Sequence, residues 1–265
     1  MRVLRNALIG VALSGVFAAV LLWFLPARWA MPWIEPQLHG LRLQQVHGSL
    51  WNGVADEVMA ANGKRLGQLQ WQLSRRALLG QLRLQLAFEG SGLTFSGTTR
   101  RLPDGRIEAR GLSLHAQLAA LGQHVDTPWG NPAGELQVTA SHVLLQGGWP
   151  LTLQARGQWL DAGMHIRGGE VALGALQFQA RAEGGVMQAQ WQDDGHGPLQ
   201  ARGELQLSPL GWRLDARARA RQTDPALQHW LARFGPMSPD GSVHIQQSGG
   251  LAGMPSSTDK GAMQP

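Results

Sequence analysis

The chain begins with a long apolar segment. Residues 7–25 carry no charged side chain. A helix rises about 1.5 Å per residue, so a helix over this run is roughly 28 Å long, close to the thickness of the hydrocarbon core of a bilayer. The pattern predicts a transmembrane helix over 7–25, because uncharged runs of this length are rare inside soluble domains.

The residues on either side predict how that helix is oriented. Arg28 lies close behind the run, where a signal peptidase requires small residues, so we expect an anchor that is not cleaved. Arg2 and Arg5 precede the run, and this charge bias predicts that residues 1–6 are a short cytoplasmic start. Indole rings suited to a membrane interface follow at the far end: Trp23, Trp29 and Trp33.

Beyond a linker expected over 26–40, apolar and polar residues alternate with a period of two. In GQLQWQL, for example, Leu69, Trp71 and Leu73 alternate with glutamines. Side chains of a strand point to alternate faces, so each segment is expected to form a strand with one apolar face. The same alternation recurs over 82–89, 136–140, 151–159, 176–182, 199–207 and 212–220.

Short turn signals separate these segments and define the fold class. They are Pro103-Asp104-Gly105, Gly147-Gly148, Gly168-Gly169, Gly184-Gly185 and Asp193-Asp194-Gly195. Connections this short cannot make the crossovers that parallel pairing needs. We therefore expect a mainly β, antiparallel region over 41–247. The apolar face must be covered, either by folding into a sandwich or by curling into a groove, and the sequence leaves this choice open.

Several positions on the expected apolar face are small. These residues either permit tight packing against the sheet or leave room for an acyl chain, and the sequence does not separate the two: Ala180, Ala182, Ala201, Gly203, Ala216, Ala218 and Ala220.

Helices are expected at two places in this region. Asp224 can cap a helix that starts at Pro225, whose apolar face consists of Leu227, Trp230, Leu231 and Phe234. Such a helix is expected to cover one end of the sheet. A second short helix is an alternative to a strand over 114–121. Residues 248–265 are poor in apolar side chains and are expected to form a flexible tail.

Composition excludes several classes of function. The chain has no cysteine, which excludes disulfides and thiolate chemistry. Its formal net charge is +5, but the basic residues are mostly arginines spread singly along the strands and form no stripe that could neutralise a phosphate backbone. We expect no binding of nucleic acid.

No motif predicts catalysis. The nine histidines stand apart in the sequence, without an H-E-x-x-H pattern, so no metal site is expected. Asp193 and Asp194 are adjacent, and with Gly195 they indicate a solvated turn rather than a pair of catalytic carboxylates. We find no phosphate loop and no nucleophile elbow, and we expect neither a cofactor nor an enzymatic activity.

One local pattern is more specific. The segment VHGSLWNG over 46–53 is followed by Trp71-Gln72-Leu73 and by ALLG over 77–80. With this pattern the chain resembles the N protein family of the bacterial type II secretion system. The order of a cytoplasmic start, one anchor and a β-rich region is similar to that family as well. Weaker similarity extends over GELQLSP at 203–209, over Gly211-Trp212 and over PDGSV at 239–243.

The resemblance implies a function. Members of this family are non-enzymatic accessory components of the secretion machinery, so the resemblance implies an inner-membrane protein with a periplasmic β domain. It implies contacts with the inner-membrane platform subunits and with the outer-membrane secretin. The motif residues expected to matter, for architecture rather than for direct contact, are Gly48, Trp51, Asn52, Gly53 and Trp71.

The residues alone also suggest a hairpin corner at this motif. Trp51 is expected to bury its ring, and Asn52-Gly53 are expected to supply the left-handed backbone of a tight turn.

Two other functions remain open at this point. A membrane-tethered β-groove of the AsmA-like or lipopolysaccharide-bridge type would hold lipid as a ligand between its apolar strands. A tethered structural domain with an unrelated partner is the third alternative.

Overall fold

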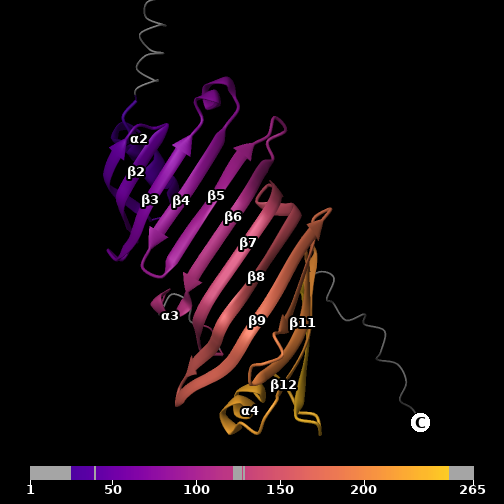
Figure 1. Cartoon of the computed structure of the whole chain (residues 1–265). Helices are drawn as coiled ribbons and strands as arrows, with labels where there is room; N and C mark the ends of the chain where they lie inside the picture. The colour runs from indigo at the N-terminus through magenta and orange to yellow at the C-terminus, as the bar shows by residue number, and fades with distance from the viewer. Residues whose placement is uncertain (1–24, 39, 122–126, 128, 251–265) are drawn as a thin grey trace, which may run out of the picture. The chain divides into compact units, whose positions relative to one another are not determined.

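The computed structural model describes residues 25–38, 40–121, 127 and 129–250. The chain divides into two compact units, residues 1–104 and residues 105–265 (Figure 1). Among the described residues, no helix is both long enough and apolar enough to cross a bilayer. Except for Leu25, the anchor expected over 7–25 lies outside the described residues, as does the tail beyond Gly250.

Unit 1 is a five-stranded antiparallel meander preceded by a short helix. The part of the chain expected to be a linker contains this helix. The elements are α2 (Ala27–Ile34), η1 (Glu35–Leu38), β1 (Arg42–Gly48), β2 (Asn52–Met59), β3 (Arg65–Leu73), η2 (Arg75–Leu79), β4 (Arg83–Gly90) and β5 (Leu93–Arg101). Each strand pairs antiparallel with the next, so β1 and β5 are the outer strands of the unit.

Unit 2 is an eight-stranded antiparallel meander with two short helices. The elements are β6 (Ile107–Gln117), α3 (Leu118–Leu121), β7 (Asn131–Gln146), β8 (Trp149–Ile166), β9 (Gly169–Glu183), β10 (Val186–Asp193), β11 (Leu199–Ser208), β12 (Gly211–Ala220), α4 (Pro225–Leu231) and β13 (Ser242–Gly250). The strand order follows the chain from β6 to β13.

The prediction of a mainly β, antiparallel fold is confirmed. The alternating segments form strands, and the glycine pairs at 147–148 and 184–185 form the turns between them. In the described part of unit 2 the strands form one open layer, in which β6 and β13 do not pair with each other, so the sandwich alternative is not what forms there.

Strands β7 and β8 are longer than the alternation indicated, because bulges let the pairing continue. Asp161 takes a left-handed backbone with φ of 47°, and the register between β8 and β9 shifts between Trp159 and Ala162. The bulge breaks the period-two pattern in the sequence, while the ladder resumes on the other side of it.

The helix expected at Asp224 is confirmed and covers part of the apolar face. The Asp224 carboxylate accepts hydrogen bonds from the backbone N–H groups of Ala226 at 2.9 Å and Leu227 at 3.1 Å. Leu227 and Leu231 are fully buried against residues of β9, β11 and β13. The α-helix ends at Leu231, before Phe234, which stays half-buried and packs edge-on against Trp230.

Two local expectations differ from the structure. Over 114–121 the strand β6 continues to Gln117, and the helix α3 has only four residues, because cross-strand pairing with β7 wins over helical spacing. The β region was expected to end at residue 247. Strand β13 instead continues three residues further, to Gly250, because it pairs with β12.

Candidate functional site

The five residues singled out from the sequence lie together at one end of unit 1. β1 ends at Gly48, and β2 begins at Asn52, directly after Trp51. Gly48 pairs with Gly53 across β1 and β2, and Gly53 pairs with Trp71 across β2 and β3. The motif therefore joins three consecutive strands. We call residues 48–53 together with Trp71 the corner.

The left-handed residue of the corner is Gly48, with φ of 85°, and the expectation that Asn52-Gly53 take this conformation is wrong. Asn52 and Gly53 are already part of β2. The turn is closed by Ser49, whose N–H donates to the Asn52 carbonyl at 2.9 Å and whose hydroxyl accepts from the Asn52 N–H at 3.2 Å. A Cβ on Gly48 would lie 2.5 Å from the Asn52 carbonyl oxygen, so this position requires glycine on two grounds.

Gly53 is needed for a different reason, since the Trp71 ring lies on it. A Cβ built on Gly53 would lie 2.2 Å from Cζ2 of Trp71. The indole N–H of Trp71 donates to the Leu50 carbonyl at 3.1 Å. Trp51 is buried, with 5% of its surface exposed, and its carbonyl accepts from the Leu73 N–H at 2.7 Å. The two tryptophans thus hold the corner onto β3.

Unit 2 repeats the contact between an aromatic ring and a glycine, which the sequence analysis missed. Trp191 on β10 pairs with Gly203 on β11, and a Cβ on Gly203 would lie 2.2 Å from Cζ2 of Trp191. Phe178 lies in the same way on Gly157 of the neighbouring strand. The only signal in the sequence was a glycine inside an alternating strand, and it becomes interpretable only once the register is known.

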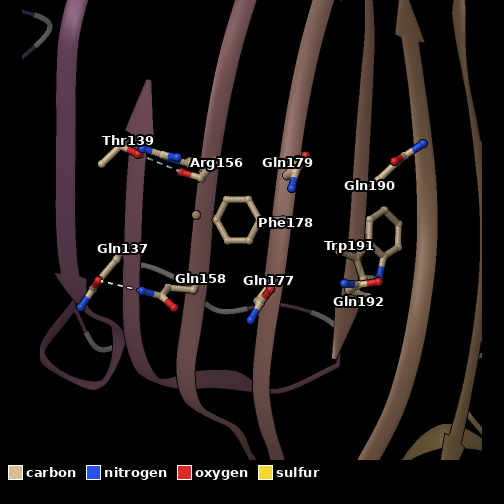
Figure 2. Close-up of a pocket in the computed structure, with 11 residues that line it drawn as sticks. Gln137, Thr139, Arg156, Gln158, Gln177, Phe178, Gln179, Gln190, Trp191 and Gln192 are labelled. Atoms are coloured by element: carbon tan, nitrogen blue, oxygen red, sulfur yellow. Dashed lines mark hydrogen bonds between the residues drawn. The ribbon is translucent and has the colours of Figure 1, made fainter. Parts of the chain in front are cut away.

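The polar face of unit 2 carries a row of glutamines in register. Gln137, Gln158, Gln177 and Gln192 are successive cross-strand partners from β7 to β10. The Gln158 amide donates to the Gln137 carbonyl oxygen at 3.2 Å. Figure 2 shows this row, with Thr139, Arg156, Gln179 and Gln190 forming the next one. Both rows line a hollow of about 470 Å³.

The glutamine row continues into a charged region. Gln192 is followed across the strands by Arg202, Arg217 and His244. In the adjacent row Asp215 accepts hydrogen bonds from His244 at 3.0 Å and from the Gln246 amide at 2.9 Å, which hold the pKa of Asp215 below its ordinary value, the Gln246 bond being the larger cause. These side chains offer hydrogen bonds and charge, which suit the binding of polar groups.

The Asp193-Asp194 pair forms a turn, as the sequence indicated. Asp193 ends β10, and its carboxylate accepts from the N–H of Ala201 at 2.8 Å and of Gly195 at 2.9 Å, and from the Arg221 guanidinium. Partial burial raises the pKa of Asp193, but these hydrogen bonds outweigh it and the net pKa is lowered. Asp194 accepts from the His196 N–H at 2.9 Å, which lowers its pKa. Both carboxylates hold the loop.

Cross-strand pairing gives many histidines a carboxylate partner, although they stand apart in the sequence. Examples are His47 with Asp56 at 3.2 Å and His244 with Asp215 at 3.0 Å. Each pair has a single histidine on the sheet surface. In the part of the chain that the structure describes, no three such residues are placed so that they could hold a metal ion.

The last strand presents an unprotected edge. Among the described residues, β13 pairs with β12 on one side, and on the other side its backbone pairs only near its start, through the bridge of Met237 to Val243 and the N–H of Ser238 donating to the Ser242 carbonyl. Within the described residues the stretch from His244 to Gly250 is an open edge that contains no Asp, Glu, Lys or Arg. Such an edge can accept a further strand.

The open layers, the polar face and the free edge define an antiparallel β protein suited to binding other molecules. A model of the type II secretion system protein N family matches residues 39–246, so most of the chain is covered. The chain belongs to this family, as its sequence motif indicated. Comparisons with curated proteins and with solved structures found no match.

Proposed function

We propose that this chain is a non-enzymatic accessory component of type II secretion, anchored in the bacterial inner membrane by residues 7–25. Its β units lie in the periplasm and contact the inner-membrane platform and the secretin. The observation that carries the proposal is the family match over 39–246. The apolar run of membrane-spanning length supports the anchorage.

Anchorage lets weak contacts be sufficient. A tether confines the β units close to the platform, which raises their effective concentration there and converts a second contact into an intramolecular one. The lining of the hollow on unit 2 supports this function, because amide and guanidinium groups suit the polar rim of a protein interface. The corner residues Gly48, Trp51, Asn52, Gly53 and Trp71 keep their proposed role as architecture.

The edge of β13 is the proposed contact with a secretion subunit. A strand of the partner adds to the stretch from His244 to Gly250, so backbone hydrogen bonds supply the affinity. The incoming strand extends the apolar face at Ile245 and the polar face at Gln246, since successive side chains of β13 point to alternate faces.

In-cell photocrosslinking tests this function. A photoreactive amino acid replaces Gln247 at the open edge, or the exposed Gln188 on the inner strand β10 as the matched control, in the full chain in its native membrane. We expect captured platform or secretin subunits from the Gln247 variant and far fewer from the Gln188 variant. Equal capture from both positions would overturn the strand-addition contact.

The identity of the captured molecules tests the function as a whole. Mild-detergent purification after crosslinking, followed by mass spectrometry of proteins and lipids, is expected to recover secretion subunits. Stoichiometric lipid without secretion subunits would assign the chain to the lipid-handling alternative. Captured proteins unrelated to secretion would favour the third alternative of a tethered domain with another partner.

A further inference from the structure

The loop between β3 and β4 exposes large apolar side chains. Leu79 is 82% exposed, Leu78 is 50% exposed and Leu82 is 40% exposed. We call residues 74–82 the leucine loop. Leucines gathered in this way on a surface mark contact with a protein or with a membrane.

The leucine loop is held in one conformation rather than left loose. The Ser74 hydroxyl accepts from the Arg76 N–H at 3.3 Å and caps the helical turn η2. Gly80 closes the turn with φ of 81°, and its N–H donates to the Ala77 carbonyl at 3.0 Å. The turn therefore presents Leu78 and Leu79 outward as part of an ordered structure.

Backbone hydrogen bonds place this loop at the end of unit 1 where the apolar run arrives. The Leu50 N–H donates to the carbonyl of Leu25, the last residue of that run, at 2.9 Å. Two further backbone hydrogen bonds continue this connection to the leucine loop. The Leu73 N–H donates to the Trp51 carbonyl at 2.7 Å, and the Ser74 N–H donates to the Arg83 carbonyl at 2.8 Å. The β3–β4 loop thus lies at the same end of the unit as the start of α2 (Figure 1).

Arginines surround the leucines at this end. Arg75 and Arg76 belong to the leucine loop, and Arg83 follows it, all three with exposed side chains. Arg100 is the cross-strand partner of Arg83, and the backbone N–H of Arg101 donates to the Leu82 carbonyl. A hollow of about 490 Å³ beside the loop is lined by Arg75 and Arg83 together with Trp51, Leu73 and neutral polar residues.

Apolar tips flanked by basic side chains match the surface of an anionic bilayer. Leucines enter the boundary between headgroups and acyl chains, while arginine side chains reach the lipid phosphates. Basic residues near an anionic surface add attraction to the apolar contribution. The distance to the membrane is short if Leu25 ends the anchor, so the inference rests on the anchorage proposed above.

We infer that the leucine loop is a second membrane contact, in which Leu78 and Leu79 insert into the interface of a bilayer containing anionic phospholipid and the neighbouring arginines bind lipid phosphate. One anchor alone leaves the β units free to tilt about it. A second contact fixes the orientation of unit 1 to the bilayer.

Spin labelling of the full chain tests this contact, because the chain has no cysteine and each introduced one is a unique label site. Leu79→Cys carries the label in the leucine loop. Ser91→Cys, in the turn at the opposite end of unit 1, is the matched control with an exposed side chain. Both variants are reconstituted into vesicles of phosphatidylethanolamine and phosphatidylglycerol. Collision rates with oxygen and with a water-soluble nickel chelate are then measured.

We expect the label at position 79 to collide severalfold more with oxygen, relative to the nickel chelate, than the label at position 91. A label at 79 that is as accessible to nickel as the control would overturn the inference. So would a label shielded from both reagents, which would mean that protein covers the loop.

The arginines are tested by changing the lipid. In vesicles of phosphatidylcholine alone, the label at position 79 is expected to lie shallower, because the surface no longer carries net charge. An unchanged depth would overturn the role of the arginines. Loss of the anchorage itself is read separately, as extraction of the unlabelled chain from native membranes by alkaline carbonate.

Discussion

The two units contain the same contact between an indole ring and a glycine, but they hold the adjacent loop by different chemistry. In unit 1 Trp71 lies on Gly53, and its own N–H donates to Leu50 in the corner. In unit 2 Trp191 lies on Gly203, and among the described residues no acceptor lies against its indole N–H. The carboxylate of Asp193 holds the following loop instead.

The difference indicates what each tryptophan contributes. The Trp71 ring packs on Gly53, and its N–H donates a hydrogen bond to the Leu50 carbonyl. Trp71 therefore stabilises both the pairing of β2 with β3 and the turn that precedes β2. Trp191 contributes packing, and the reversal depends on an ionised group whose state changes with pH. We therefore expect the stability of the corner to be independent of pH, and the loop after β10 to lose stability in acid. Substitutions in the full chain, followed by thermal unfolding in detergent micelles, test this contrast.

The largest loss of stability is expected for Trp51→Ala, which removes a buried indole ring from the corner. Trp51 is 5% exposed, and removing a buried ring of this size costs about 3–5 kcal/mol of unfolding free energy. Far-ultraviolet circular dichroism is expected to show a clearly lower melting temperature. An unchanged melting temperature would contradict the structural assignment of the corner, and Trp29→Ala, at a ring that is 60% exposed, is the control.

Gly53→Ala is expected to be the next most harmful substitution. The new Cβ would lie 2.2 Å from the Trp71 ring, which is held by its hydrogen bond to Leu50 and cannot swing away without losing it. Overpacking of this kind costs about 1–3 kcal/mol. A melting temperature equal to that of the parent chain would show that the ring moves freely.

Gly203→Ala provides the matched test in unit 2. A Cβ on Gly203 would lie equally close to the Trp191 ring, 2.2 Å, but this ring makes no hydrogen bond within the described part of the chain that it could lose. We therefore expect a loss of about 1 kcal/mol, at the low end of the range for overpacking. If Gly203→Ala destabilises more than Gly53→Ala, the hydrogen bond is not what makes the corner rigid.

A feature can be predicted from the sequence when the residues that determine it are close together in the chain. The strands, the Asp224 cap and the glycine turns follow from neighbouring residues, and the structure confirms them. The motif predicted that Trp51 would be buried, which it is. The role of Gly53 could not be predicted, because its partner is Trp71, which is distant in the sequence and is identified only by the register of β2 and β3. Asp193 was recognised as part of a turn, whereas its bonds to Ala201 and Arg221 depend on the same kind of long-range pairing.

The most specific effect is expected for Asp193→Asn, and it is no larger than the effect of Gly203→Ala. Because hydrogen bonds lower the pKa of Asp193 from its ordinary value of 3.8, the ionised carboxylate stabilises the fold above about pH 4, and this contribution is lost as pH falls through the lowered pKa. We expect the parent chain to be more stable than Asp193→Asn by about 1 kcal/mol at neutral pH, the net contribution of a typical hydrogen bond after exchange with water. The difference should shrink towards zero in strong acid.

Melting curves from neutral to acidic pH measure this difference in stability. Trp71→Phe is the comparison, since loss of the indole hydrogen bond in unit 1 should lower stability by the same amount at every pH. Parallel pH profiles for both variants would mean that the two loops are held in the same way, contrary to the geometry.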